Sequence, residues 1–250
     1  MSKHIYFIAP DGRAVQARSA SSWFTNRCDA TLIVQPATLN GKYPDRAQGR
    51  ELHVTFAGGY DPIAFQLLDA HVEQQLTVPG GEFIVYRSSR SDLQGLALWR
   101  GPYHEIASWL PPVAESEGID PWGRFSGLRI EDAPDGVLVT SAAESAVNVR
   151  VTDVSNYVEG VGMLYFYAPA EALGRVPTFK GRSVPSGEVW RTTVTDLDDG
   201  PVQTHFVLAS PQSVVSLVPE HGAAPKYGRQ LAFLESLLHV ESNALARKAS

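Results

Sequence analysis

The chain has 250 residues, of which 44% are hydrophobic and 19% are charged, and its formal net charge at pH 7 is -6. This apolar content argues against disorder, and the acidic balance argues against a nucleic-acid-binding surface. A single cysteine, Cys28, excludes a disulfide scaffold, and no apolar run approaches the roughly 18 residues of a membrane-spanning helix.

The apolar stretch at 5–8 is too short for a secretion signal. We therefore expect a globular protein of one or two domains that is cytoplasmic, or is exported without such a signal.

Eight short segments have the composition of β-strands. Each is rich in β-branched or aromatic residues, and most are flanked by Gly, Pro, Asp, Asn or Ser. They are 5–8, 31–34, 52–56, 83–86, 137–140, 147–152, 163–167 and 205–208. Most connections are too short, or too rich in turn residues, for the helices that join parallel strands. The sequence therefore predicts a mainly β protein built of antiparallel sheets.

Two segments are predicted to be helical. The first covers 62–73, with Asp61 as its N-cap. The second follows Pro225, where leucines recur at helical spacing. These leucines are Leu231, Leu234, Leu238 and Leu245. We expect this C-terminal helix either to dock on the β core or to associate with a partner or a second copy.

Short sequence segments recur in the same order in the two halves of the chain. Ala9-Pro-Asp-Gly12 returns as Ala133-Pro-Asp-Gly136, and Val78-Pro-Gly-Gly-Glu82 returns as Val184-Pro-Ser-Gly-Glu188. The second match continues from 86–93 into 190–197. Pro-x-Gly is typical of hairpin turns. The pattern predicts an internal duplication, giving two tandem antiparallel domains of sandwich or jelly-roll type; the alternative is chance similarity in a Gly- and Pro-rich sequence.

The duplication suggests how the chain divides. We expect a first β domain at 1–112, an aromatic and Pro-rich connection at 113–126, a second β domain at 127–222 and the C-terminal helix at 223–250. Each β domain has about 100 residues, which is enough for a core of its own.

The sequence predicts no metal site and no cofactor. The seven histidines form no HxH, HExxH or HxxxH pattern, and one cysteine cannot build a thiolate zinc site. No nucleophile elbow and no glycine-rich phosphate loop is present.

One segment carries a weak catalytic signal. His53-Val54-Thr55 resembles the HxT half-motif of 2H phosphoesterases, in which two such strands face each other. The resemblance implies that His53 and a second histidine act as base and acid, while hydroxyls hold the phosphate. The candidate for that second histidine is His205, whose segment lacks the hydroxyl.

Aromatic and basic residues gather near the middle of the chain. They are Trp99, Arg100, Tyr103, His104, Trp109, Trp122 and Arg124. Such rings can stack on a sugar, another small ligand or a protein partner, or they can pack two domains together. His104 and Glu105 are a weak acid–base pair, because adjacent residues of a strand point to opposite faces.

The leading hypothesis is a non-catalytic binding or assembly module with two related β domains, which forms part of an oligomer or a virus-like assembly. A protein partner or self-association is expected, without membrane or nucleic acid. Two alternatives stay open: a hydrolase or phosphoesterase using His53 and His205, and a sugar- or small-ligand-binding protein using the central aromatics. The sequence does not decide whether the protein is an enzyme.

Overall fold

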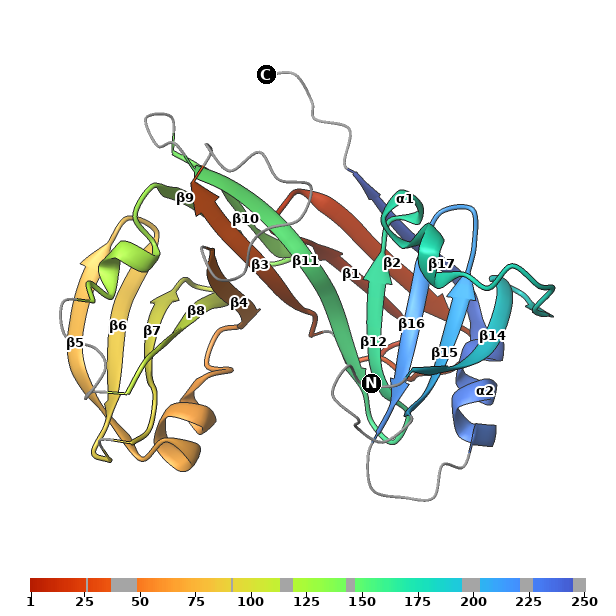
Figure 1. Cartoon of the computed structure of the whole chain (residues 1–250), viewed down its shortest axis with the longest axis horizontal. Helices are drawn as coiled ribbons and strands as arrows, with labels where there is room; N and C mark the ends of the chain where they lie inside the picture. The colour runs from red at the N-terminus through yellow and green to blue at the C-terminus, as the bar shows by residue number, and fades with distance from the viewer. Residues whose placement is uncertain are drawn as a thin grey trace. The chain divides into compact units, whose positions relative to one another are not determined.

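The computed structural model describes residues 1–25, 27–36, 49–90, 92–112, 119–142, 147–194, 203–220 and 227–244. The protein is mainly β, with large antiparallel sheets, and all eight predicted strands are present (Figure 1). In the described ranges, no helix is long and apolar enough to cross a membrane.

The chain forms two compact units. Unit 1 comprises Met1–Phe7, Gly12–Cys28 and Asp153–Ser250, and unit 2 comprises Ile8–Asp11 and Asp29–Thr152. The predicted limits of 1–112 and 127–222 follow the sequence repeat, whereas the compact units combine segments from both halves. Part of the predicted connection, 113–118, and the segments 221–226 and 245–250 lie outside the described residues.

In the described ranges, unit 2 contains a six-stranded arrangement in which every pair of neighbouring strands is antiparallel. In spatial order they are β3 (Asp29–Pro36), β4 (Arg50–Phe56), β8 (His104–Leu110), β7 (Gly95–Arg100), β6 (Gly81–Ser88) and β5 (Ala70–Val78). The unit also holds the short helices η1 (Ile63–Leu67) and η3 (Trp122–Arg124) and the hairpin of β9 (Leu128–Ala133) and β10 (Gly136–Ser141).

Both faces of this sheet are buried at its centre. On one face, the η1 segment packs Ala64 and Leu68 against Ile84 and Leu98. On the other face, the Phe83 ring meets Phe125 edge-on, with ring centroids 5.7 Å apart. Strands that are covered on both faces have nearly continuous apolar sequences, as the segment 83–86 of β6 has.

Unit 1 also contains a six-stranded antiparallel arrangement. Its strands in spatial order are β11 (Val147–Val158), β12 (Gly162–Tyr167), β16 (Val214–Pro219), β15 (Gln203–Ala209), β14 (Gly187–Val194) and β13 (Arg182–Val184). A second group consists of β17 (Leu237–Ala244), β2 (Arg13–Ser19) and β1 (His4–Ile8). The helical segments are α1 (Pro169–Ala172), η4 (Leu173–Arg175) and α2 (Tyr227–Ser236). Along the chain, β11 begins in unit 2 and continues into unit 1 at Asp153.

The two six-stranded arrangements have the same strand order. It is β3-β4-β8-β7-β6-β5 in unit 2 and β11-β12-β16-β15-β14-β13 in unit 1 (Figure 1). In each, a short helical segment follows the second strand along the chain: η1 lies between β4 and β5, and α1 with η4 lies between β12 and β13. The recurring Pro-x-Gly segments occupy corresponding places, since one joins β5 to β6 and the other joins β13 to β14.

The helix predicted at 62–73 is much shorter than expected. Its helical part is η1, and β5 begins at Ala70. Asp69 adopts a left-handed backbone conformation, with φ of 47°, which ends the helix. The next residues then pair with β6, so tertiary hydrogen bonding overrides the local helical pattern. Asp61 caps nothing here; its carboxylate pairs with Arg100.

The C-terminal helix also ends early. α2 stops at Ser236, and the next eight residues form β17, which pairs with β2. The helix does dock on the core, because buried Phe233 meets the Trp23 and Phe24 rings edge-on at 5.6 and 5.8 Å. The segment after it becomes a strand because its backbone groups find partners on β2.

Gly81 allows a close backbone approach that sets the place of Arg100. A Cβ at Gly81 would lie 2.1 Å from the Arg100 carbonyl oxygen. We therefore expect Gly81→Ala to lower the free energy of unfolding by about 1–3 kcal/mol. Gly228→Ala in α2 is the control, since a Cβ there meets nothing within 4 Å. Urea titrations followed by tryptophan fluorescence measure both, and equal midpoints for Gly81→Ala and the wild type would contradict the prediction.

Candidate functional site

Unit 2 contains a pocket of about 240 Å³ between one face of its sheet and the turn that precedes η1. Its lining residues are Asp29, Ala30, Thr31, His53, Val54, Thr55, Gly59, Tyr60 and Ile63. His53 and Thr55, which the sequence singles out, therefore line one pocket.

The register of three strands puts the polar groups of the pocket on one face. Thr31 on β3 lies opposite His53 on β4, and Thr55 lies opposite Glu105 on β8. Alternate residues of a strand share a face, so His53 and Thr55 point the same way. The same alternation places Asp29 on the face of Thr31.

Glycines shape the turn that closes the pocket. Gly58 has a φ of 81°, in the left-handed region that favours glycine. At Gly59, a Cβ would lie 2.6 Å from the Thr55 methyl carbon and 2.9 Å from the Phe56 carbonyl oxygen. The Gly-Gly pair thus lets the turn lie close against β4 and carries Tyr60 over the sheet.

A buried carboxylate fixes this turn to the sheet. The Glu105 side chain is fully buried, and its oxygens accept hydrogen bonds from the Gly58 amide at 2.8 Å and the Tyr60 amide at 3.0 Å. The Arg100 guanidinium also donates to Glu105, from the neighbouring strand β7. Arg100 donates in addition to Asp61, at 2.5 Å. Backbone amides and a cation together therefore satisfy the buried charge.

The positive charge of Arg100 is held by its acidic neighbours. Burial by itself lowers the pKa of Arg100, but its hydrogen bond to Asp61 and its interactions with Glu105 outweigh that effect and raise the pKa. Arg100 therefore stays protonated. The carboxylate of Glu105 is surrounded by donors on both oxygens, which suits a structural role better than proton transfer.

His53 lies between two polar neighbours. Its Nε2 is 3.2 Å from a carboxylate oxygen of Glu51, and its Nδ1 is 3.5 Å from the Thr31 hydroxyl. Burial lowers the pKa of His53, and the charge of Glu51 opposes this only in part. At neutral pH the imidazole is therefore neutral, with one donor and one acceptor nitrogen.

Two hydroxyls of the pocket have no hydrogen-bond partner among the described residues. In the described part of the chain, neither the Tyr60 hydroxyl nor the Thr55 hydroxyl makes a hydrogen bond. Burial, followed by the charges of Asp29 and Glu105, raises the pKa of Tyr60. Tyr60 therefore keeps its proton and can donate to a ligand.

The remaining weak catalytic candidate lies elsewhere. His205 is on β15 of unit 1, opposite Thr192, and is not among the residues that line this pocket. The pairing of His53 with His205 stays a prediction.

The central aromatics divide between the two faces of the unit 2 sheet. Trp99 is buried opposite Phe83 on one face, where Trp122 packs edge-on against Phe83 with ring centroids 5.0 Å apart. Trp109 lies on the other face, packed against the core beneath η1. Arg124 belongs to η3, beside Trp122.

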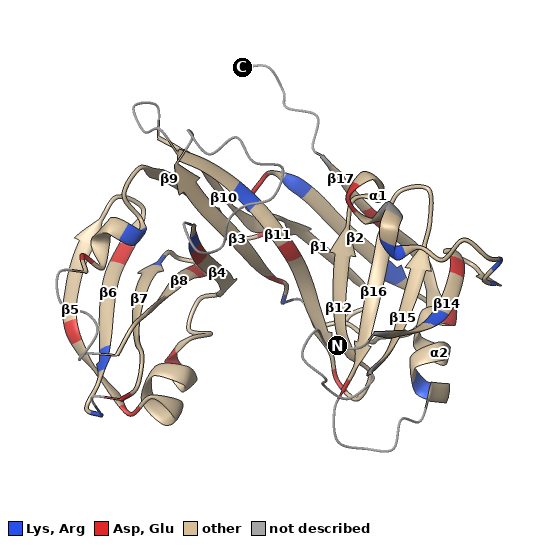
Figure 2. Ribbon diagram, in the orientation of Figure 1, with Lys and Arg blue, Asp and Glu red and all other residues tan. Residues whose placement is uncertain are grey.

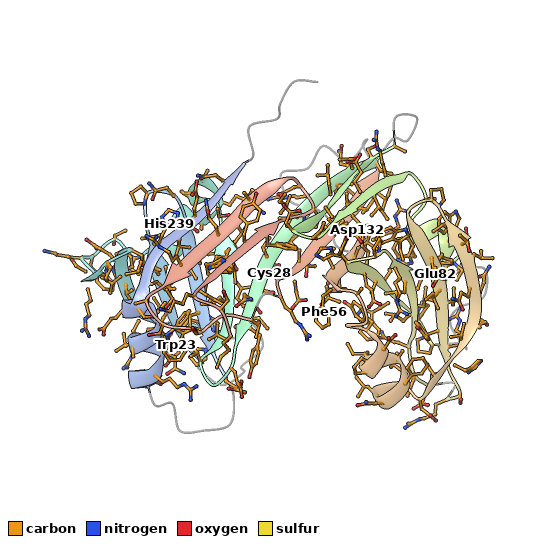
Figure 3. All side chains as sticks on the ribbon, turned by 180° about the vertical axis from the view of Figure 1, so that it is seen from behind. Trp23, Cys28, Phe56, Glu82, Asp132 and His239 are labelled. Carbon is orange, nitrogen blue, oxygen red and sulfur yellow. The ribbon has the colours of Figure 1, made fainter. Side chains whose placement is uncertain are left out.

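His104 and Tyr103 are tied to β9. Asp132 accepts hydrogen bonds from the backbone amides of both residues, and its other oxygen is 2.6 Å from the His104 imidazole (Asp132 is labelled in Figure 3). Glu105 points to the opposite face, toward the turn. The alternation of strand residues thus separates His104 from Glu105.

Charge is mixed across the molecule. Figure 2 shows Lys and Arg interspersed with Asp and Glu on the strands. In the described ranges, no three His, Cys, Asp or Glu side chains come together in a group that could hold a metal ion.

Sequence reasoning missed part of the site. Asp29, Thr31 and Tyr60 carry no local signal of a shared function. The one available hint was period-two alternation on the strands, which places Thr31 on one face but does not say which strand pairs with it.

Replacing Glu105 should destabilise unit 2. In Glu105→Gln, Arg100 loses its buried partner and an amide NH₂ faces backbone donors, so we expect a loss of about 3 kcal/mol in the free energy of unfolding. The control is Asp92→Asn, which removes an exposed pair with Arg90 and should change nothing measurable. Denaturant unfolding measures both. Wild-type stability in Glu105→Gln would contradict the anchoring role.

His53 should make stability depend on pH. Its lowered pKa means that the unfolded chain binds this proton more readily, so stability falls as pH decreases below about 6.5, the usual histidine value. As the pH decreases from about 7.5 to about 5, we expect the free energy of unfolding to fall less in His53→Asn than in the wild type. Urea titrations at several pH values measure the difference. Parallel profiles would show that His53 titrates as a free histidine does.

Comparison with known proteins identifies no relative. The chain matches no family model, and no curated protein or solved structure is significantly similar to it.

Proposed function

We propose that this protein is a non-catalytic binding module and that the pocket around His53 in unit 2 is its ligand site. One observation carries the proposal. The buried acid beside the pocket, Glu105, is fully engaged by Arg100 and two backbone amides, while Thr55 and Tyr60 line the pocket and their hydroxyls have no partner in the described chain. The pocket thus offers hydrogen-bonding groups, while the fully buried acid beside it, Glu105, is held in a structural network.

The phosphoesterase alternative finds less support in this geometry. His53 and Thr55 do line one pocket, as a half-motif would require. However, the described lining contains neither a second histidine to act as the acid nor a Lys or Arg to pair with a phosphate. His53 instead contacts Glu51 and Thr31.

We also infer that the two six-stranded arrangements arose by duplication. The matching strand order, the matching place of the helical segments and the recurring Pro-x-Gly turns support this. The strand of unit 1 that corresponds to β4 is β12, whose sequence GMLYFY has no histidine or threonine. On this reading, the ligand site belongs to one copy, and the other copy keeps the fold without it.

Two measurements test binding against catalysis. The first is a fragment screen by amide NMR, in which we expect compounds that shift the signals of Thr31, His53 and Tyr60. The second is hydrolysis of bis(p-nitrophenyl) phosphate and a 2′,3′-cyclic nucleotide, in which we expect no turnover that depends on His53.

The matched variant for both is His53→Ala, with His71→Ala on the exposed strand β5 as the control. Turnover lost in His53→Ala but retained in His71→Ala would overturn the proposal in favour of an enzyme. A screen in which no fragment shifts the pocket signals would also overturn it.

A further inference from the structure

We propose that the His53 pocket binds a neutral ligand with adjacent hydroxyl groups, of the size of one sugar ring or a cyclic polyol. This inference rests on the proposed function and names the ligand class of the same site. It follows from three properties of the lining: its hydrogen-bonding groups, its charge and its size.

The hydrogen-bonding groups are of mixed type. The Thr55 and Tyr60 hydroxyls can each donate and accept, and neither has a partner in the described part of the chain. The Thr31 hydroxyl has only a 3.5 Å contact to His53, at the limit of a hydrogen bond. A hydroxyl group likewise donates and accepts at one atom, so neighbouring ligand hydroxyls match this set better than a group that only donates or only accepts.

Charge selects against ionic ligands. The lining contains Asp29 but no Lys or Arg among its described residues, and Glu51 stands next to His53. A phosphate or carboxylate would therefore enter without a cation and face two acids. An ammonium group would have to compete with the interactions that Asp29 and Glu51 already make within the chain.

The apolar part of the lining suits a ring. Ile63 and the ring of Tyr60 contribute apolar surface beside the polar groups, which matches the C–H surface of a sugar. The side chains of Ala30 and Val54, by contrast, point to the other face of the sheet. The volume of about 240 Å³ lies just below the roughly 300 Å³ at which pockets for drug-sized ligands begin. One ring fits this description better than an oligosaccharide does.

The experiment compares ligands that share one ring and differ in charge. D-glucose, D-galactose, D-mannose and myo-inositol are the neutral probes, and glucosamine and glucose 6-phosphate are the charged ones. Amide NMR of the full chain follows the signals of Thr31, His53 and Tyr60 up to about 50 mM ligand, which covers millimolar Kd values. We expect at least one neutral probe to bind, and glucose 6-phosphate to bind more weakly than glucose.

Two near-isosteric variants test the contacts. Tyr60→Phe and Thr31→Val each remove one hydroxyl, and each should weaken binding of the neutral probe by about 2- to 10-fold, as the loss of a neutral hydrogen bond does. Thr77→Val on the exposed strand β5 is the matched control and should bind as the wild type does. Dispersed amide spectra confirm that each variant is folded.

The outcomes separate this inference from the proposed function. If none of the neutral probes binds, or if only glucosamine or glucose 6-phosphate binds, the ligand class is wrong even when the fragment screen shows a binding site. Equal affinity in Tyr60→Phe, Thr31→Val and the wild type would also overturn it, since the bound ring would then lie elsewhere.

Discussion

The buried carboxylate of Glu105 is the interaction on which the candidate site depends. A carboxylate removed from water is strongly destabilising unless cations and hydrogen-bond donors replace the water. Here Arg100 supplies the cation, and the amides of Gly58 and Tyr60 supply the donors. The same bonds hold the turn against the sheet, so the compensation of one charge also forms the wall of the pocket. Arg100 in turn reaches Asp61, which ties the start of η1 to β7.

This arrangement explains why the pocket is suited to binding. Glu105 and Arg100 are occupied in holding the turn against the sheet, while the hydroxyl residues Thr31, Thr55 and Tyr60 line the pocket. The η1 segment packs on this face of the sheet, and the Glu105 side chain on the same face is fully buried. The hydrogen-bond network holds the residues that line the pocket in place before a ligand arrives. These residues therefore lose little conformational freedom on binding, and even weak hydrogen bonds from their hydroxyls add to the affinity.

The two segments predicted to be helical show that the local sequence pattern does not determine where a helix ends. Their leucines and other apolar residues do recur at helical spacing, and helices do form at η1 and α2. Both helices stop where the following residues can pair with a neighbouring strand, at Ala70 beside β6 and at Leu237 beside β2. Propensity differs by less than about 1 kcal/mol per residue for most residue types, so a run of tertiary hydrogen bonds outweighs it. Asp61 illustrates the same point, since its carboxylate forms an ion pair with Arg100 and does not cap the helix.

The sequence alone determined the β class, the eight strands and the Pro-x-Gly hairpins, because composition and turn chemistry are local properties. It also placed His53 and Thr55 on one face, since alternation along a strand needs no tertiary information. Only the tertiary structure decided that Thr31 lies beside His53 and that Glu105 holds Tyr60, from 22 and 45 residues away. Such contacts depend on which strands pair and in which register, and that choice is made by packing of the whole sheet rather than by any one segment.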